Sequence, residues 1–228
     1  LACLIGQLMS MKVVVGSVVR MRTRALYACV EQRASWNAPV IISSEALDEL
    51  MFWKEHVRGS NLTDLSLEER DSDAVVCTDA SGDGFGGHVV DLFDSEVVGS
   101  WSADESILSS TWRELEAVYR VLQSRSGVLE GKKISVHTDN QNVAGILSSG
   151  SRRSHLQKIA VDVDNVCRLR NIKINPVWIP RSENVYADTL SRCGDSDDWS
   201  VHDWVFKIMD RLLGPHTIDR FACDYNTK

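Results

Sequence analysis

The spacing of hydrophobic and polar positions changes along this chain of 228 residues, and the changes divide it into parts. Apolar residues recur at helical spacing over Leu1–Lys12 and Val18–Val30, and Ser43-Ser44-Glu45 is typical of a helix start. The polar stretch 61–73 has the composition of a linker. We therefore expect residues 1–60 to form a small helical segment.

Beyond the linker, the pattern changes to strands that alternate with helices. The expected strands are Ala74–Asp79, Phe85–Asp91, Glu96–Trp101, Lys133–Thr138 and Lys173–Trp178. The expected helices are Ser109–Ser124, Asn140–Leu147, Ser154–Leu169 and Glu183–Ser191. Hairpins followed by strands and helices in turn predict an α/β domain over 74–192, with a mixed sheet and helices packed on it. Glycines 82, 84, 86 and 87 suit a sharp corner after the first strand. The C-terminal extension, 193–228, contains one more helical pattern, Val201–Leu213.

Composition sets broad limits on the class of protein. With 43% hydrophobic and 25% charged residues, the chain has the make-up of a globular protein. No apolar run is long enough to cross a membrane, and no signal peptide is recognisable, so we expect no membrane partner. The six scattered cysteines form no C-x-x-C pair, which favours reduced thiols and an intracellular location, in the cytoplasm or nucleus. Because the chain begins with Leu1 and not Met, we expect it to be a piece of a longer protein.

The formal net charge of −7 weighs against nucleic-acid binding, since phosphate attracts positive charge. Two local clusters are positive, although the chain as a whole is negative. They are Arg20, Arg22 and Arg24 in the helical segment, and Arg152 with Arg153 before a helix. Either cluster is as well explained by a solvated helix face as by phosphate contacts.

Four acidic residues stand in settings that favour a shared site: Asp79, Glu114, Asp139 and Asp188. Asp79 and Asp139 end strands, whereas Glu114 and Asp188 lie in expected helices. Such positions can converge on one point of the fold. Carboxylates without Cys or His ligands suit hard cations such as Mg²⁺, and paired ions are the usual device for displacement at phosphorus.

Each of these residues also has an ordinary structural interpretation. Asp79 is a favoured turn residue, and Asp139 is a favoured helix cap. Asn184 and Asp188 lie four residues apart and therefore share one helix face, which solvent alone would explain. Periodicity cannot choose between Glu114 and Glu116, because both flank the apolar stripe at similar angles.

Taken together, the four settings resemble the ribonuclease H family. The matching segments are Thr78–Gly82, Arg113–Val118, Thr138–Asn140 and Asn184–Arg192, in the family's order. The last of them is similar to the form found in retrotransposon reverse transcriptases. The resemblance implies a ribonuclease H-like five-stranded mixed sheet flanked by helices. It also selects Glu114 over Glu116 as a metal ligand.

By this resemblance, the chain hydrolyses the RNA strand of an RNA–DNA hybrid with two Mg²⁺ ions, for which Mn²⁺ can substitute. Asp79 would bridge the ions, Glu114 and Asp139 would hold one, and Asp188 the other. The implied substrate contacts are Ser81, Ser110, Gln141 and Asn184. Contacts to 2′-hydroxyl groups would distinguish RNA from DNA.

The flanking segments are similar to those of DIRS-like retroelements, which use a tyrosine recombinase. The similar positions are Trp36–Pro39, Ser43–Leu50, Trp53, Asp198–Ser200 and Asp219–Ala222. Residues 1–60 would then be a thumb or connection-like segment, and the polymerase part of the same polyprotein would be a partner. The polymerase's own paired-aspartate hairpin is absent from the sequence.

Two departures from the family leave alternatives open. Trp178 stands ten residues before Asp188, where many relatives have a histidine, and the basic handle of some cellular members is missing after 147. One alternative is a catalytically silent module of the same fold that binds nucleic acid or a protein. Another is a transposase or integrase, although the segment 184–192 is not typical of those enzymes.

Overall fold

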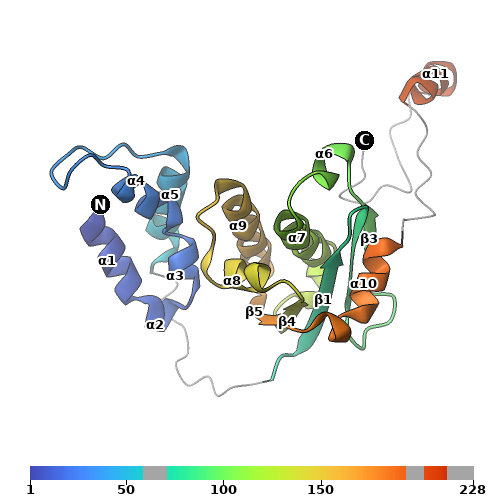
Figure 1. Ribbon diagram of the computed structural model, residues 1–228, viewed down its shortest axis with the longest axis horizontal. Coiled ribbons are helices and arrows are strands. Elements are labelled where there is room, and N and C mark those ends of the chain that lie inside the picture. Colours follow the sequence, from blue (N-terminus) through green and yellow to red (C-terminus); the bar gives the residue numbers. More distant parts are fainter. Residues whose placement is uncertain (59–70, 194–202, 215–228) are drawn as a thin grey trace.

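A five-stranded mixed sheet forms the centre of the computed structural model, which describes residues 1–58, 71–193 and 203–214 (Figure 1). The strands are β1 (Ala74–Ala80), β2 (Gly84–Val89), β3 (Val97–Ser100), β4 (Lys133–Thr138) and β5 (Lys173–Trp178). Their order across the sheet is β3-β2-β1-β4-β5. β1 pairs antiparallel with β2 and parallel with β4. This arrangement confirms the mixed α/β architecture that the sequence predicts.

Helices cover both faces of the sheet. They are α6 (Ala103–Ser106), α7 (Ser110–Leu129), α8 (Gln141–Ser149), α9 (Ser154–Leu169) and α10 (Val185–Arg192). A Cβ atom built on Gly86 would meet α10, and one built on Gly87 would meet Val121 of α7. Because neighbouring strand residues point to opposite faces, α7 and α10 lie on opposite sides of the sheet. The main core lies on the α7 side, where α7 also packs against α9.

The glycines of β2 have a different role from the one expected. Gly84, Gly86 and Gly87 lie inside the strand and do not form a corner, and none has a positive φ. A Cβ atom on Gly86 would come within 2.4 Å of the Ser191 backbone nitrogen and 2.5 Å of the Leu190 carbonyl carbon. Glycine at this position therefore lets α10 approach the sheet closely, which fixes where Asp188 lies.

The helices differ from the expectation at several places. α7 continues to Leu129, beyond the expected end at Ser124, because Leu129 is fully buried. The helix α6 was not expected, although Ser102 and Glu105 form a capping box at its start. The single helix expected over 18–30 is divided into α3 (Val18–Met21) and α4 (Arg24–Glu31).

Residues 1–58 form the helical segment that the sequence predicts, with the further helices α1 (Ala2–Ser10), α2 (Lys12–Val15) and α5 (Ser44–His56). It has small apolar clusters of its own, one of them formed by Leu8, Val19 and Trp53. The buried Glu49 of α5 accepts hydrogen bonds from the backbone nitrogens of Ala25 and Leu26, and so caps α4. This cap explains why the chain starts a new helix after Thr23.

The helical segment is attached to the sheet domain through Arg22, which is 6% exposed. Its guanidinium donates to Asp164 Oδ2 at 2.5 Å and 2.8 Å, and to Asn165 Oδ1 at 2.6 Å. Gln157 of α9 donates to the Met21 carbonyl at 2.8 Å. The segment therefore packs against α8 and α9, as Figure 1 shows.

The C-terminal helix α11 spans Asp203–Leu213, close to the expected range. The segments 198–200 and 219–222, and most of the expected linker, lie outside the described residues. None of the described helices is long and apolar enough to cross a membrane.

Candidate active site

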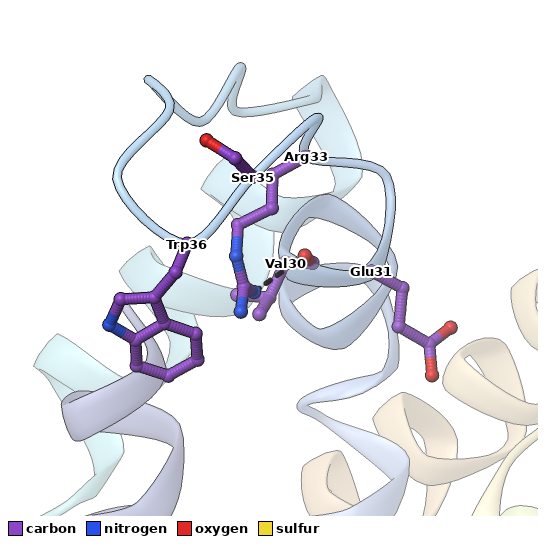
Figure 2. Close-up of a pocket in the computed structure, with 5 residues that line it drawn as sticks. All are labelled: Val30, Glu31, Arg33, Ser35 and Trp36. Atoms are coloured by element: carbon purple, nitrogen blue, oxygen red, sulfur yellow. Dashed lines mark hydrogen bonds between the residues drawn. The ribbon is translucent and has the colours of Figure 1, made fainter.

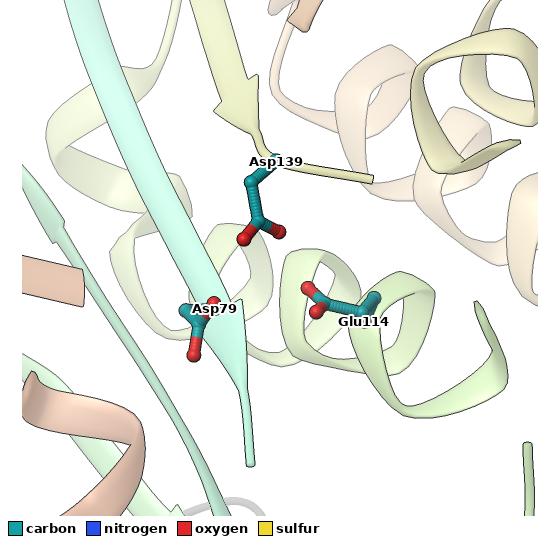
Figure 3. Close-up of side chains that lie close together, drawn as sticks. All are labelled: Asp79, Glu114 and Asp139. Atoms are coloured by element: carbon teal, nitrogen blue, oxygen red, sulfur yellow. The ribbon is translucent and has the colours of Figure 1, made fainter. Parts of the chain in front are cut away.

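Three of the four predicted carboxylates meet at one edge of the sheet. Asp79 lies near the end of β1, Asp139 directly follows β4, and Glu114 lies in the second turn of α7. One carboxylate oxygen from each lies within 4.8 Å of the others (Figure 3). Because β1 and β4 are parallel neighbours, their carboxyl ends bring the two aspartates to the same edge.

Glu114 is the most buried acid of this group after Asp79, with 8% of its surface exposed. Its Oε2 atom has no hydrogen-bond partner among the described residues. Burial, together with the negative charges of Asp79 and Asp139, raises the pKa of Glu114 to about 9. An unpartnered buried carboxylate is costly to maintain, and a bound cation would remove that cost. Glu116 instead forms an ion pair with Arg120 at 3.0 Å.

Asp79 is 3% exposed, and one side chain within the described part of the chain fixes its carboxylate. Ser191 of α10 donates a hydrogen bond from its hydroxyl to Asp79 Oδ2 at 2.6 Å. Burial raises the pKa of Asp79, Asp139 and Asp188 add to that rise, and the Ser191 bond opposes it. Among the described residues, this bond leaves the other oxygen of Asp79, Oδ1, without a side-chain donor.

Asp139 does not cap the following helix, contrary to the expectation. Asn140 is the N-cap of α8, and its side chain accepts from the Asn142 backbone nitrogen. The carboxylate of Asp139 therefore remains available to the cluster. Its backbone carbonyl accepts a hydrogen bond of 2.9 Å from the indole nitrogen of Trp178, which is 45% exposed.

Asp188 lies on α10 outside the group of three, among the residues that the structure describes. Its carboxylate forms ion pairs with Arg181 and with Arg192, the latter at 3.0 Å. Hydrogen bonds from Arg192 and Arg181 lower the pKa of Asp188. The coulombic effects of Asp188 and Arg181 on Asp79 place them near the cluster. Asp188 as a ligand of a second ion stays a prediction.

The four predicted substrate contacts fall into two kinds. Ser110 and Gln141 are exposed first residues of α7 and α8, beside Glu114 and Asp139. Ser81 and Asn184 support the backbone instead. Ser81 Oγ lies 2.6 Å from the Ser191 carbonyl oxygen, and Asn184, 2% exposed, donates to the Thr78 carbonyl at 2.9 Å. Whether any of them contacts a substrate stays a prediction.

Sequence reasoning missed three residues that shape the site: Ser191, Arg181 and Arg192. Ser191 and Arg192 belong to the segment 184–192, but nothing in its spacing showed that Ser191 would reach Asp79. Arg181 precedes Asp188 by seven residues and is joined to it by a short 3-10 turn, Arg181–Glu183. The sequence did contain one signal for the two arginines, because Arg181 and Arg192 lie on either side of Asp188.

Two hollows of the surface, formed by described residues, lie away from the carboxylates. One of about 330 Å³ is lined by residues of the α4 end, where the Arg33 guanidinium lies 4.3 Å from the centroid of a Trp36 ring (Figure 2). Another, of about 660 Å³, lies at the β2–β3 hairpin and Tyr186. Neither has a group of convergent carboxylates, so the cluster at the sheet edge remains the candidate site.

The donor set of the cluster fits a hard divalent cation. It supplies carboxylate oxygens alone, and the unpartnered Glu114 Oε2 points to a ligand that the protein does not provide. Asp79, Glu114 and Asp139 are therefore close enough together to hold a metal ion.

The fold and the site together define a mixed α/β domain with an acidic cluster at the carboxyl edge of its sheet. The chain belongs to the reverse transcriptase-like family, whose model matches residues 72–194. That range includes all four predicted carboxylates. None of the curated proteins matches the chain.

Solved structures with similar folds share little sequence with the chain. RNase H1 from Halobacterium salinarum is 17% identical, with 51% of this chain and 92% of that one covered and a TM-score of 0.42. LC11-RNase H1, solved in complex with an RNA/DNA hybrid, is 18% identical, with 56% and 100% covered and a TM-score of 0.46. The foamy viral protease–reverse transcriptase with RNA/DNA hybrid is 14% identical, with 69% and 27% covered and a TM-score of 0.41.

Proposed function

We propose that this chain is the ribonuclease H part of a retroelement reverse transcriptase, and that it hydrolyses the RNA strand of RNA–DNA hybrids. The observation that carries the proposal is the group Asp79, Glu114 and Asp139, with a buried oxygen of Glu114 left unpartnered. The family match over 72–194 supports the same class of enzyme. The polymerase part of the same polyprotein is the proposed partner.

Each residue of the candidate active site has a proposed role in metal binding, orientation or substrate contact. Asp79, Glu114 and Asp139 would hold Mg²⁺, and Asp188 would complete the site for a second ion. Bound Mg²⁺ would lower the pKa of an attacking water and stabilise the charge on the departing 3′-oxygen. Ser191 keeps Asp79 in one orientation, and Arg181 and Arg192 keep Asp188 ionised. Ser110 and Gln141 are the exposed candidates for contacts with the hybrid.

The test is cleavage of labelled RNA–DNA hybrid by the full chain with Mg²⁺, with Mn²⁺ and with EDTA. Asp79→Asn should abolish metal-dependent cleavage, because it removes one charge from the centre of the cluster. Asp83→Asn is the matched control, since Asp83 is an exposed aspartate four residues further on. Cleavage by Asp79→Asn at the parent rate would contradict the assignment.

The alternative is a silent module of the same fold, and Trp178 at the position of the family's histidine is the observation that favours it. Hybrid binding without cleavage, in either metal, would support that alternative. Cleavage of duplex DNA in preference to hybrid would favour a transposase or integrase instead.

A further inference from the structure

Acidic residues are distributed very unevenly along this chain. Residues 1–30 contain four Lys or Arg and no Asp or Glu, and residues 140–161 contain three Lys or Arg and again none. The two stretches together carry a formal charge of +7. Since the whole chain carries −7, the remaining residues carry −14.

The structure brings these two stretches into contact. Arg24 donates from Nε to the Ser149 carbonyl at 2.9 Å and from Nη2 to the Gly150 carbonyl at 3.3 Å. A Cβ atom built on Gly150 would lie 3.1 Å from the Met21 Cα, so the backbones approach closely. In Figure 1, α3 lies beside the connection from α8 to α9.

Positive side chains gather where the stretches meet. Arg20, Arg152 and Arg153 are exposed, and Arg24 is half-buried between them and α8. Burial and the positive charges of Arg20 and Arg152 lower the pKa of Arg24, which shows that these guanidinium groups are close to one another. Arg22, by contrast, is paired with Asp164 and contributes no free charge. We call the exposed set Arg20, Arg152 and Arg153 the junction patch.

The junction patch lies at the opposite end of α8 from the carboxylate cluster. α8 begins at Gln141, two residues after Asp139, and ends at Ser149, so its nine residues span about 14 Å. A nucleic-acid strand advances roughly 3.4 Å per nucleotide, and α8 therefore spans about four nucleotides. Along α8, the patch therefore lies about four nucleotides from the cluster.

We propose that the junction patch binds the phosphate backbone of the nucleic-acid duplex whose RNA strand lies at the carboxylates. The proposal rests on the proposed function for the position of the duplex. Arg20 of the patch comes from the helical segment, and Arg152 and Arg153 come from the α8–α9 connection, so the surface exists only when the two parts are packed together. Guanidinium groups suit phosphate oxygens, and such contacts carry no sequence preference.

The test measures binding separately from cleavage, in the full chain carrying Asp79→Asn. The Kd for a labelled RNA–DNA hybrid is measured by fluorescence anisotropy at several salt concentrations. The variant Arg20→Gln/Arg152→Gln/Arg153→Gln should weaken binding at least tenfold at about 50 mM salt, and should reduce the slope of log K against log salt by about 2 to 3. A DNA duplex of the same sequence should lose affinity by a similar factor.

The matched control is Lys54→Gln/Arg58→Gln/Lys173→Gln, which removes the same charge from exposed positions outside the junction patch. It should keep the parent slope. Equal slopes in the two variants, or a parent chain whose binding does not depend on salt, would overturn the proposal. The patch variant could lose binding while the parent chain does not cleave the hybrid. That result would support phosphate binding by the junction patch and contradict the proposed function.

Discussion

Buried charge occurs both at the carboxylate cluster and at the junction of the helical segment with the sheet domain, but only the junction neutralises it. At the junction, Arg22 contacts Asp164 and Asn165, and its guanidinium also lies 4.4 Å from the Phe52 ring centroid. At the cluster, Asp79, Glu114 and Asp139 face one another, and none of the ion pairs formed by the described residues includes them. A set of paired charges stabilises a packing arrangement, whereas the repulsion within a set of like charges is relieved by a bound cation or by a proton.

The largest effect we expect distinguishes two neighbouring glutamates of α7. Glu114→Gln should reduce metal-dependent hybrid cleavage at least about a hundredfold, because it removes a charge that faces the ion. Glu116→Gln should stay within a few-fold of the parent rate, since Glu116 is paired with Arg120. Initial rates at saturating hybrid measure both. Equal losses in the two variants would mean that burial on α7, and not the cluster, sets the rate.

The next effect concerns the junction. Arg22→Ala should lower the free energy of unfolding by about 3 kcal/mol, because it leaves the carboxylate of Asp164 with much less compensation in a nearly buried site. Urea denaturation followed by circular dichroism gives the value. The control is Arg170→Ala, whose pair with Glu130 is half-exposed and contributes at most about 1 kcal/mol. A loss for Arg22→Ala no larger than that of the control would show that the junction is weakly held.

The sequence predicted the sheet well, because its signals are local. β4, β5 and α9 have the expected bounds, since each is a continuous apolar or amphipathic run. The break between α3 and α4 was missed because its causes lie far along the chain. Glu49 caps α4, and the Trp53 indole nitrogen donates to the Arg22 carbonyl at 2.8 Å.

In the candidate site, too, some features follow from local sequence patterns and others depend on residues far along the chain. The positions of Asp79 and Asp139 at strand ends predicted that their carboxylates can converge. Their shared edge depends on the parallel pairing of β1 with β4, which the sequence did not predict. The choice of Glu114 over Glu116 came from family resemblance, since the two residues flank the apolar stripe of the helix at similar angles and periodicity does not separate them. The Ser191 bond to Asp79 depends on how closely α10 approaches β2, and therefore on Gly86, which a one-dimensional pattern does not reveal.

A smaller effect is the pH dependence of the free energy of unfolding, which arises at the carboxylate cluster. The pKa of Glu114 is raised to about 9 in the folded chain, so the folded state binds a proton that the unfolded state has lost above about 4.5. The metal-free protein should therefore lose stability as pH rises from about 4.5 towards 9. Glu114→Gln should be more stable than the parent by roughly 1 to 3 kcal/mol at pH 7.

Denaturation of both chains at pH 5, 7 and 8.5, with EDTA and then with Mg²⁺, measures this effect. The gap between the chains should widen with pH in EDTA. Mg²⁺ should narrow it, because the ion binds the ionised glutamate and stabilises the parent chain. A gap that does not change with pH would mean that Glu114 is ionised in the folded chain without metal.

The smallest effect concerns Trp178, the residue that favours the alternative of a catalytically silent module. Trp178→Phe keeps an aromatic ring but removes the hydrogen bond to the Asp139 carbonyl, and such a bond contributes about 0.5 to 1.5 kcal/mol. If that bond orients Asp139 towards the other carboxylates, the affinity for Mn²⁺ should fall by roughly two- to tenfold. Isothermal titration measures it without any substrate. Trp204→Phe, at another exposed tryptophan, should leave the affinity unchanged. Equal affinities in the two variants would show that Asp139 keeps its orientation without Trp178, and the indole would then be free to contact a ligand.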